Sequence, residues 1–205
     1  MSEFPVLTRE DLDPEQRAYW DEITRGPRGF YTGGPNSKRL PDLYNAWMQF
    51  PGLGRAVMGL ADEVRAQPEL SGKFRELIVL TSSILLGARV EYEFHIPFAR
   101  DQGLSEDLIA AIGEGATPPF SDDAERIIYE ANVQLLRSSK LTEKTRDEVV
   151  GIVGLRGLVQ LIGVIIIYVA TAYTTNVAGA KLAGDFSADP EKLKNFYAGR
   201  PAESE

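Results

Sequence analysis

The residues of this sequence that could carry out chemistry are two glutamates and its single histidine. Glu91 and His95 are four positions apart, so on a helix their side chains lie on one face at neighbouring turns. A nearby carboxylate favours the charged imidazole and burial opposes it, so such a pair can exchange protons near neutral pH. Glu76 lies upstream as a second candidate partner for the ring. The cluster predicts general acid–base chemistry.

Residue types that the sequence lacks limit the other kinds of chemistry. There is no cysteine, which excludes disulfide, thiol and thiolate–metal chemistry. Glu91 and His95 alone do not make a metal site, and there is no second histidine, so we expect no metal. A lone histidine on an apolar helix is also typical of a hydrogen-bonded structural residue, and this alternative stays open.

The elements that must position these residues are predicted to be helices, because apolar residues recur at helical spacing between capping residues and glycines. The predicted helices lie within 1–25, twice within 42–66, at 72–87, 88–103, 104–115 and 121–140, and as a short and a long helix within 141–184. Residues 26–41 hold four glycines and three prolines and are predicted to form a loop.

The composition is typical of one globular domain. The chain has 205 residues, of which 43% are hydrophobic and 25% charged. We predict a single all-α domain over residues 1–184 and a polar tail over 185–205. The net charge of -8 and the scattered basic residues argue against nucleic-acid binding. The first residues, Met-Ser-Glu-Phe-Pro, do not resemble a secretory signal, so we expect a cytoplasmic protein.

The segment from Val149 to Ala172 approaches the length and apolarity of a membrane span. Arg156 and Gln160 lie inside it, and an arginine at the centre of a span costs roughly 2.5–3.5 kcal/mol on insertion scales. We therefore expect no membrane insertion. The segment is predicted to be a helix buried in a domain core or a subunit interface.

Around these residues the chain resembles the carboxymuconolactone decarboxylase and AhpD-like superfamily. The resemblance is carried by Arg75-Glu76-Leu77 and the following "VLTSSILLGARVEYEFHIPFARDQGLSEDLIAAI", with support from "GPRGFYTGGP", "RLPDLYNAW" and the long apolar helix. It covers most of residues 20–180. It implies an AhpD-like array of about seven to nine helices that assembles as a homotrimer or homohexamer, with sites near the subunit contacts.

The chain departs from the peroxidase branch of that superfamily at two positions. The signature of this branch is a glutamate, a cysteine twelve positions later, a second cysteine three beyond it, and a histidine four further on. Glu76 and His95 occupy the glutamate and histidine positions, while Ala88 and Glu91 stand where the cysteines would be. The chain is therefore not a thiol peroxidase and is similar to the cysteine-free decarboxylase branch.

The resemblance implies a lyase that acts without cofactor on a small carboxylated lactone or carbonyl acid. In this interpretation His95 protonates the developing carbanion or dienolate, and Glu76 or Glu91 orients the imidazole. The candidates for binding the substrate are Arg39, Arg89, Tyr92 and Arg100, of which the arginines would hold its carboxylate. Two alternatives remain: an isomerase or hydrolase of the same superfamily, and a catalytically silent binding or assembly protein.

Overall fold

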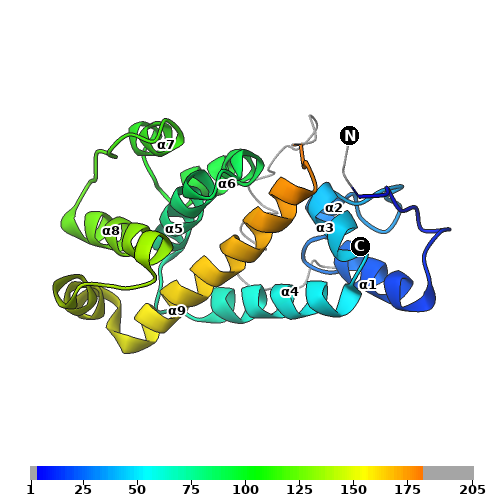
Figure 1. The fold of residues 1–205 in the computed structure, drawn as a ribbon, viewed down its shortest axis with the longest axis horizontal. Helices are drawn as coiled ribbons and strands as arrows, with labels where there is room; N and C mark the ends of the chain where they lie inside the picture. The colour runs from blue at the N-terminus through cyan, green and yellow to red at the C-terminus, as the bar shows by residue number, and fades with distance from the viewer. Residues whose placement is uncertain (1–3, 182–205) are drawn as a thin grey trace. The chain divides into compact units, whose positions relative to one another are not determined.

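The structure is a computed structural model that describes residues 4–181, and the predicted tail over 185–205 lies outside the described residues. Across residues 4–181 the chain forms nine helices and no strand (Figure 1), which confirms the predicted all-α class. The contacts divide the described residues into two compact units. One unit comprises 4–66 and 174–181, and the other comprises Gln67–Tyr173. The single domain over 1–184 stays a prediction.

The first unit contains four helices, α1 (Pro14–Arg25), α2 (Gly29–Thr32), α3 (Asp42–Trp47) and α4 (Pro51–Ala66). Its core is a cluster of buried side chains that are mainly aromatic and aliphatic. They are Leu12, Tyr19, Trp20, Ile23, Leu40, Tyr44, Trp47 and Met48. The two helices predicted within 42–66 are α3 and α4, and Pro51 is the first residue of α4. The region 26–41, predicted to be a loop throughout, contains the single turn α2, which Gly33 ends in a left-handed conformation.

The second unit contains α5 (Gly72–Leu85), α6 (Arg89–Asp101), α7 (Glu106–Gly113), α8 (Asp123–Ser138) and most of α9 (Glu143–Val177). Helix α5 packs against α6, α7 and α8, which surround it in Figure 1. Every α5 residue from Glu76 to Ser83 is buried. A carboxylate inside such a helix needs a partner, because burying a lone charge is costly.

The hairpin of α5 and α6 has well-defined ends. The Ser71 side chain accepts a hydrogen bond from the backbone N–H of Phe74 at 3.2 Å and caps α5. Gly87 has a φ of 70°, which glycine adopts without steric cost, and the chain reverses there into α6. Helix α6 then runs from Arg89 to Asp101 and includes Pro97.

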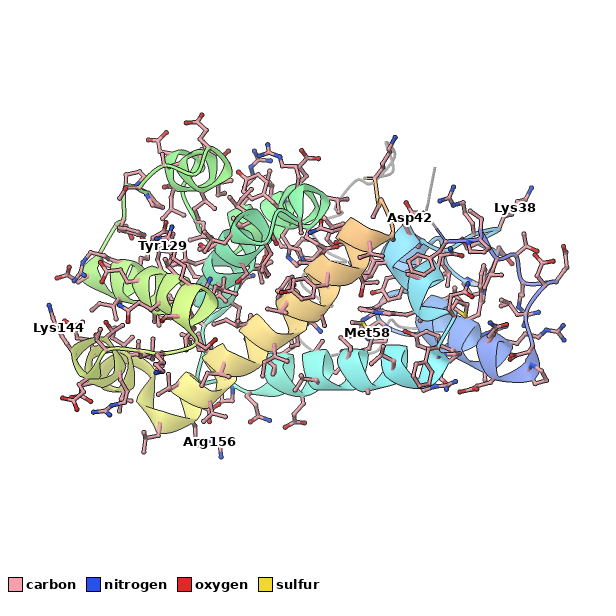
Figure 2. All side chains as sticks on the ribbon, in the orientation of Figure 1. Lys38, Asp42, Met58, Tyr129, Lys144 and Arg156 are labelled. Carbon is pink, nitrogen blue, oxygen red and sulfur yellow. The ribbon has the colours of Figure 1, made fainter. Side chains whose placement is uncertain are left out.

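Helix α9 is interrupted at Gly154, where φ is 71° and ψ is 176°. The short and long helices predicted in this region are therefore two helical segments that meet at one glycine. By length and composition α9 could cross a membrane, and 39% of its most apolar window is buried inside the structure. Arg156 follows the break, is exposed (Figure 2), and forms an ion pair with Glu69.

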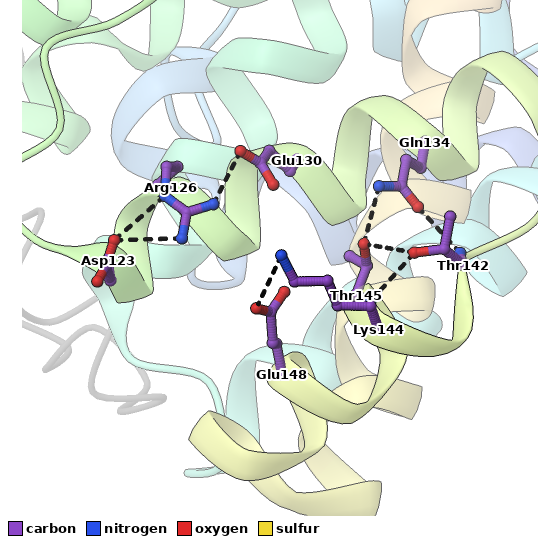
Figure 3. A network of polar contacts seen from close by, with 8 residues as sticks. All are labelled: Asp123, Arg126, Glu130, Gln134, Thr142, Lys144, Thr145 and Glu148. Carbon is purple, nitrogen blue, oxygen red and sulfur yellow. Dashed lines mark hydrogen bonds and ion pairs between the residues drawn. The ribbon is translucent and has the colours of Figure 1, made fainter.

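A network of polar contacts fixes the start of α9 against α8 (Figure 3). The amide of Gln134 donates to the Thr145 hydroxyl at 2.9 Å and accepts from the backbone N–H of Thr142 at 3.1 Å. The Thr142 hydroxyl accepts from the backbone N–H of Thr145 at 3.1 Å and so caps the start of α9. The turn between the two helices is thus held by side chains on both sides.

Candidate functional site

Three helices of the second unit converge on His95. Glu76 comes from the buried face of α5, His95 from the middle of α6, and Tyr168 from the long segment of α9. Only 3% of Glu76 and 7% of His95 are exposed to solvent. The imidazole and its partners therefore lie in a setting where electrostatic interactions are stronger than in water.

Glu76 is the hydrogen-bond partner of His95. Its Oε2 lies 2.9 Å from Nδ1 of the imidazole, and both side chains are buried. A carboxylate at this distance accepts the Nδ1 proton and thereby fixes the tautomer and the orientation of the ring. The sequence left Glu76 and Glu91 as alternatives for this position, and the contact is made by Glu76.

Tyr168 forms a hydrogen bond with the other nitrogen of the imidazole ring. Its hydroxyl lies 2.9 Å from Nε2 of His95, and the two rings meet edge to face with centroids 5.2 Å apart. The Tyr168 side chain is half-buried. The imidazole is therefore held between a carboxylate and a phenol, with each ring nitrogen in a hydrogen bond.

Phenylalanines on α6 complete the surroundings of the ring. Phe94 and Phe98 have ring centroids 5.3 and 5.1 Å from that of His95, and Phe98 is fully buried. These side chains supply apolar walls but no hydrogen bonds to the imidazole. The rotation of the ring is thus restricted by packing as well as by its two hydrogen bonds.

Glu91 lies one turn before His95 on α6 and is buried. Burial raises the pKa of the Glu91 carboxyl, and the nearby His95 charge opposes that shift. Glu91 stands at one of the two positions where the peroxidase branch carries cysteine. The structure thus places an acid with a raised pKa one turn from the imidazole.

The three candidate arginines contact acids elsewhere, and in residues 4–181 none of them contacts His95. Arg39 in the first unit pairs with Asp42 at 2.9 Å, and Arg100 pairs with Glu106 at 2.6 Å. Arg89 pairs with Glu93 at 3.0 Å and lies over the Tyr92 ring, 4.7 Å from its centroid. All three remain exposed.

Tyr92, the other candidate for substrate binding, is buried and its hydroxyl donates to the backbone carbonyl of Ile109 at 2.7 Å. This contact joins α6 to α7. Burial raises the pKa of Tyr92, so its hydroxyl keeps its proton and continues to donate. In the part of the chain that the structure describes, no group of three or more acidic or histidine side chains is arranged to hold a metal ion.

The matched portion of the chain contains the acid–imidazole cluster. Residues 51–131 match the carboxymuconolactone decarboxylase family. The match confirms the resemblance based on Glu76 and His95, and the carboxymuconolactone decarboxylase segment also includes Glu91. It ends before α9, so Tyr168 lies outside it. A comparison with curated proteins gives no match.

Solved structures show the same fold at low sequence identity. The AhpD core of an uncharacterized peroxidase-related protein from Ralstonia eutropha JMP134 aligns with a TM-score of 0.70 and 14% identity, over 98% of each chain. The debrominase Bmp8 bound to 2,3,4-tribromopyrrole aligns with a TM-score of 0.66 and 17% identity, over 96% of this chain and 100% of that one. These likenesses confirm the predicted AhpD-like fold.

Sequence reasoning did not include Tyr168 in the site. It lies in the apolar segment that was predicted to be buried in a core or a subunit interface, 73 positions from His95. The available signal was a phenol inside an otherwise apolar helical run, since a buried phenol hydroxyl needs a hydrogen-bond partner.

Proposed function

We propose that this chain is a cofactor-independent lyase that uses His95 and Glu76 to transfer a proton to a small carboxylated lactone or carbonyl acid. The observation that carries the proposal is the buried contact between Glu76 Oε2 and His95 Nδ1. The family match supports the class of substrate, since the family takes its name from the decarboxylation of such a lactone.

The proposed reaction needs one proton and an electron sink. The bond between the substrate carbon and its carboxylate breaks, carbon dioxide leaves, and the electron pair moves into the conjugated carbonyl to give a dienolate. The imidazolium form of His95 supplies the proton that this carbon then receives. Glu76 stabilises the imidazolium until that transfer, because its carboxylate lies against the Nδ1 proton.

The substrate carboxylate requires a cation, and we propose Arg89 or Arg100 on α6 for this role. Each lies in an exposed ion pair, with Glu93 and Glu106 respectively. Exposed pairs of this kind contribute only about 0–1 kcal/mol, so exchange of the protein carboxylate for that of a substrate costs little. Arg39 is the corresponding candidate in the first unit.

His95→Gln is the substitution that tests the proposal. The first substrate to test is carboxymuconolactone, followed by a panel of other carboxylated lactones and β-keto acids. Turnover is measured by the release of carbon dioxide and by proton NMR of the products. We expect turnover of at least one acid by the wild-type chain. The variant should lose it by about 10²–10⁴-fold, the usual contribution of a positioned general acid.

The matched control is Glu130→Gln, in an exposed ion pair with Arg126 on α8, where no residue of the proposed site lies. It should leave turnover within about twofold of wild type, because exposed pairs are weak. Circular dichroism checks that both variants fold. Absence of wild-type turnover across the panel, or unchanged turnover in a folded His95→Gln chain, would show that the proposed function is wrong.

We also propose that α9 lies between copies of this chain in a homotrimer or homohexamer. Four exposed apolar residues follow one another along α9 at spacings of four, three and four positions. They are Leu155, Val159, Ile162 and Ile166, with exposed fractions of 71%, 68%, 38% and 53%. This spacing puts the four side chains in one seam along the helix, the pattern of helices that pack side by side. Leaving this seam in water would be costly.

If a second copy of the chain covers this seam, the apolar side chains of α9 are explained without insertion into a membrane. We propose that the protein is cytoplasmic and needs no detergent for extraction. Recovery in the membrane fraction, with release only by detergent, would contradict this proposal.

A further inference from the structure

Tyr168 has a place in the site that the proposed function does not use. Nδ1 of His95 is occupied by Glu76 and Nε2 by the Tyr168 hydroxyl, each at 2.9 Å. An imidazole exchanges protons only through its two nitrogens. In this arrangement a substrate cannot receive a proton from the ring directly unless Tyr168 moves away.

The fraction of the side chain exposed to solvent is larger for Tyr168 than for Glu76 and His95. Glu76 and His95 are buried, whereas Tyr168 is half-buried. Of the three side chains, Tyr168 is therefore the one most accessible to a small molecule from solvent. The Phe94 and Phe98 rings at 5.3 and 5.1 Å from the imidazole further restrict access to it.

We propose that Tyr168 is a catalytic residue that delivers the proton of His95 to the substrate. This inference rests on the proposed function, since it extends the same proton transfer by one group. Glu76 is then the inner end of a relay, His95 its middle and Tyr168 its outer end. The residue comes from α9, outside the segment that matches the family.

The relay conserves protons and leaves no charged phenolate. The imidazolium donates Nε2–H to the Tyr168 oxygen while the Tyr168 O–H bond breaks and its proton passes to the substrate carbon. Afterwards the phenol has its proton again, the imidazole is neutral, and Nδ1–H still donates to Glu76. In the opposite direction, Tyr168 takes a proton from an acidic substrate C–H while neutral His95 accepts the phenol proton at Nε2.

Tyr168→Phe removes the hydroxyl and keeps the ring that packs against His95. Tyr129→Phe is the matched control, because Tyr129 is also half-buried and belongs to the same unit but lies on α8 (Figure 2), where it packs on Phe120. With the acid that the wild-type chain turns over fastest, Tyr168→Phe should lose turnover by about 10²-fold or more, as expected for a general acid. Tyr129→Phe should stay near the wild-type rate.

A double variant that carries both Tyr168→Phe and His95→Gln shows whether the two residues act in one relay or contribute to turnover independently. If the residues act in series, the double variant should be slower than His95→Gln alone by no more than about twofold, because the relay is already broken. Loss in His95→Gln with full turnover in Tyr168→Phe would end the inference and leave the proposed function intact. Unchanged turnover in His95→Gln, or no wild-type turnover, would remove both.

A measurement without substrate tests the contact at Nε2. Diethyl pyrocarbonate acylates an imidazole nitrogen, and His95 is the sole histidine of the chain, so the absorbance change reports one site. Tyr168→Phe should speed this acylation about tenfold, the effect of removing one hydrogen bond, while Tyr129→Phe should not. Equal rates in all three proteins would show that Tyr168 does not cover Nε2, and would overturn the inference.

Discussion

Among individual residues, Glu91 is the acid near His95 whose protonation the fold controls most clearly. It is buried on α6, and burial raises its pKa above the ordinary carboxyl range, with His95 opposing the shift. The folded chain therefore holds this proton at pH values where the unfolded chain has released it. By linkage, Glu91 lowers the free energy of unfolding as the pH rises through that interval.

Glu91→Gln should remove this pH-dependent decrease in the free energy of unfolding, because an amide of similar size does not titrate. We expect the stability of the variant relative to wild type to increase as the pH rises from the ordinary carboxyl range toward neutrality. Urea unfolding at a series of pH values measures this difference. Glu114→Gln, at an exposed position, is the control and should follow wild type. A difference for Glu91→Gln that decreases with pH would contradict the sign of the shift.

The site could be predicted in part from its residues. Glu76, Glu91 and His95 are linked by short sequence spacings on an α5–α6 hairpin, and the contact between Glu76 and His95 is local to that hairpin. Tyr168 depends on how α9 packs against α6, which no spacing encodes. The ion pair of Arg100 depends on Glu106, which lies beyond the end of α6 and whose side-chain direction is set only in the folded chain.

At the scale of helices, Gly154 determines how α9 is divided. Its φ of 71° and ψ of 176° lie in a region that is essentially restricted to glycine. A Cβ added there would meet no heavy atom within 4 Å, so the constraint comes from the backbone alone. The break separates the short segment beside α8 from the long segment that carries Tyr168.

Gly154→Ala should destabilise the protein by about 1–3 kcal/mol, because alanine is strained in this conformation. Gly151→Ala is the matched control, since Gly151 lies in the same helix and its added Cβ also meets nothing within 4 Å. That change should be neutral or stabilising by up to about 1 kcal/mol, because alanine favours a helix. Denaturant unfolding at one fixed protein concentration measures both. Equal effects of the two substitutions would show that the break is not required.

Helices were easier to predict than their interruptions. Caps such as Ser71 and glycines such as Gly87 mark helix ends in the sequence, and the structure has them there. The turn α2 arose within a segment rich in glycine and proline, where turn residues also permit one helical turn. The exact break in α9 could not be located, because Gly151, Gly154, Gly157 and Gly163 are all candidates in the sequence.

At the scale of the whole molecule, the exposed seam of α9 is the surface at which we propose that copies of the chain associate. Val159→Glu places a charge in the middle of the seam, where 68% of the valine is exposed in the single chain. A charge buried in an interface without a partner is strongly unfavourable, so association should weaken by about two orders of magnitude or more. Analytical ultracentrifugation should then show a smaller species.

Val6→Glu is the control for this change, because Val6 is also exposed but lies far from α9 in the sequence. It should leave the sedimentation coefficient unchanged. A Val159→Glu chain that sediments like wild type would show that the seam does not hold copies together. A wild-type chain that sediments as a monomer at every concentration would remove the assembly proposal.

Ile166 in the seam and Tyr168 beside the imidazole belong to the same helical segment, two positions apart, and face different neighbours. Displacement of that segment would disturb both at once. Specific activity should therefore decline on dilution below the concentration at which protomers separate, and a covalent cross-link between protomers should restore it.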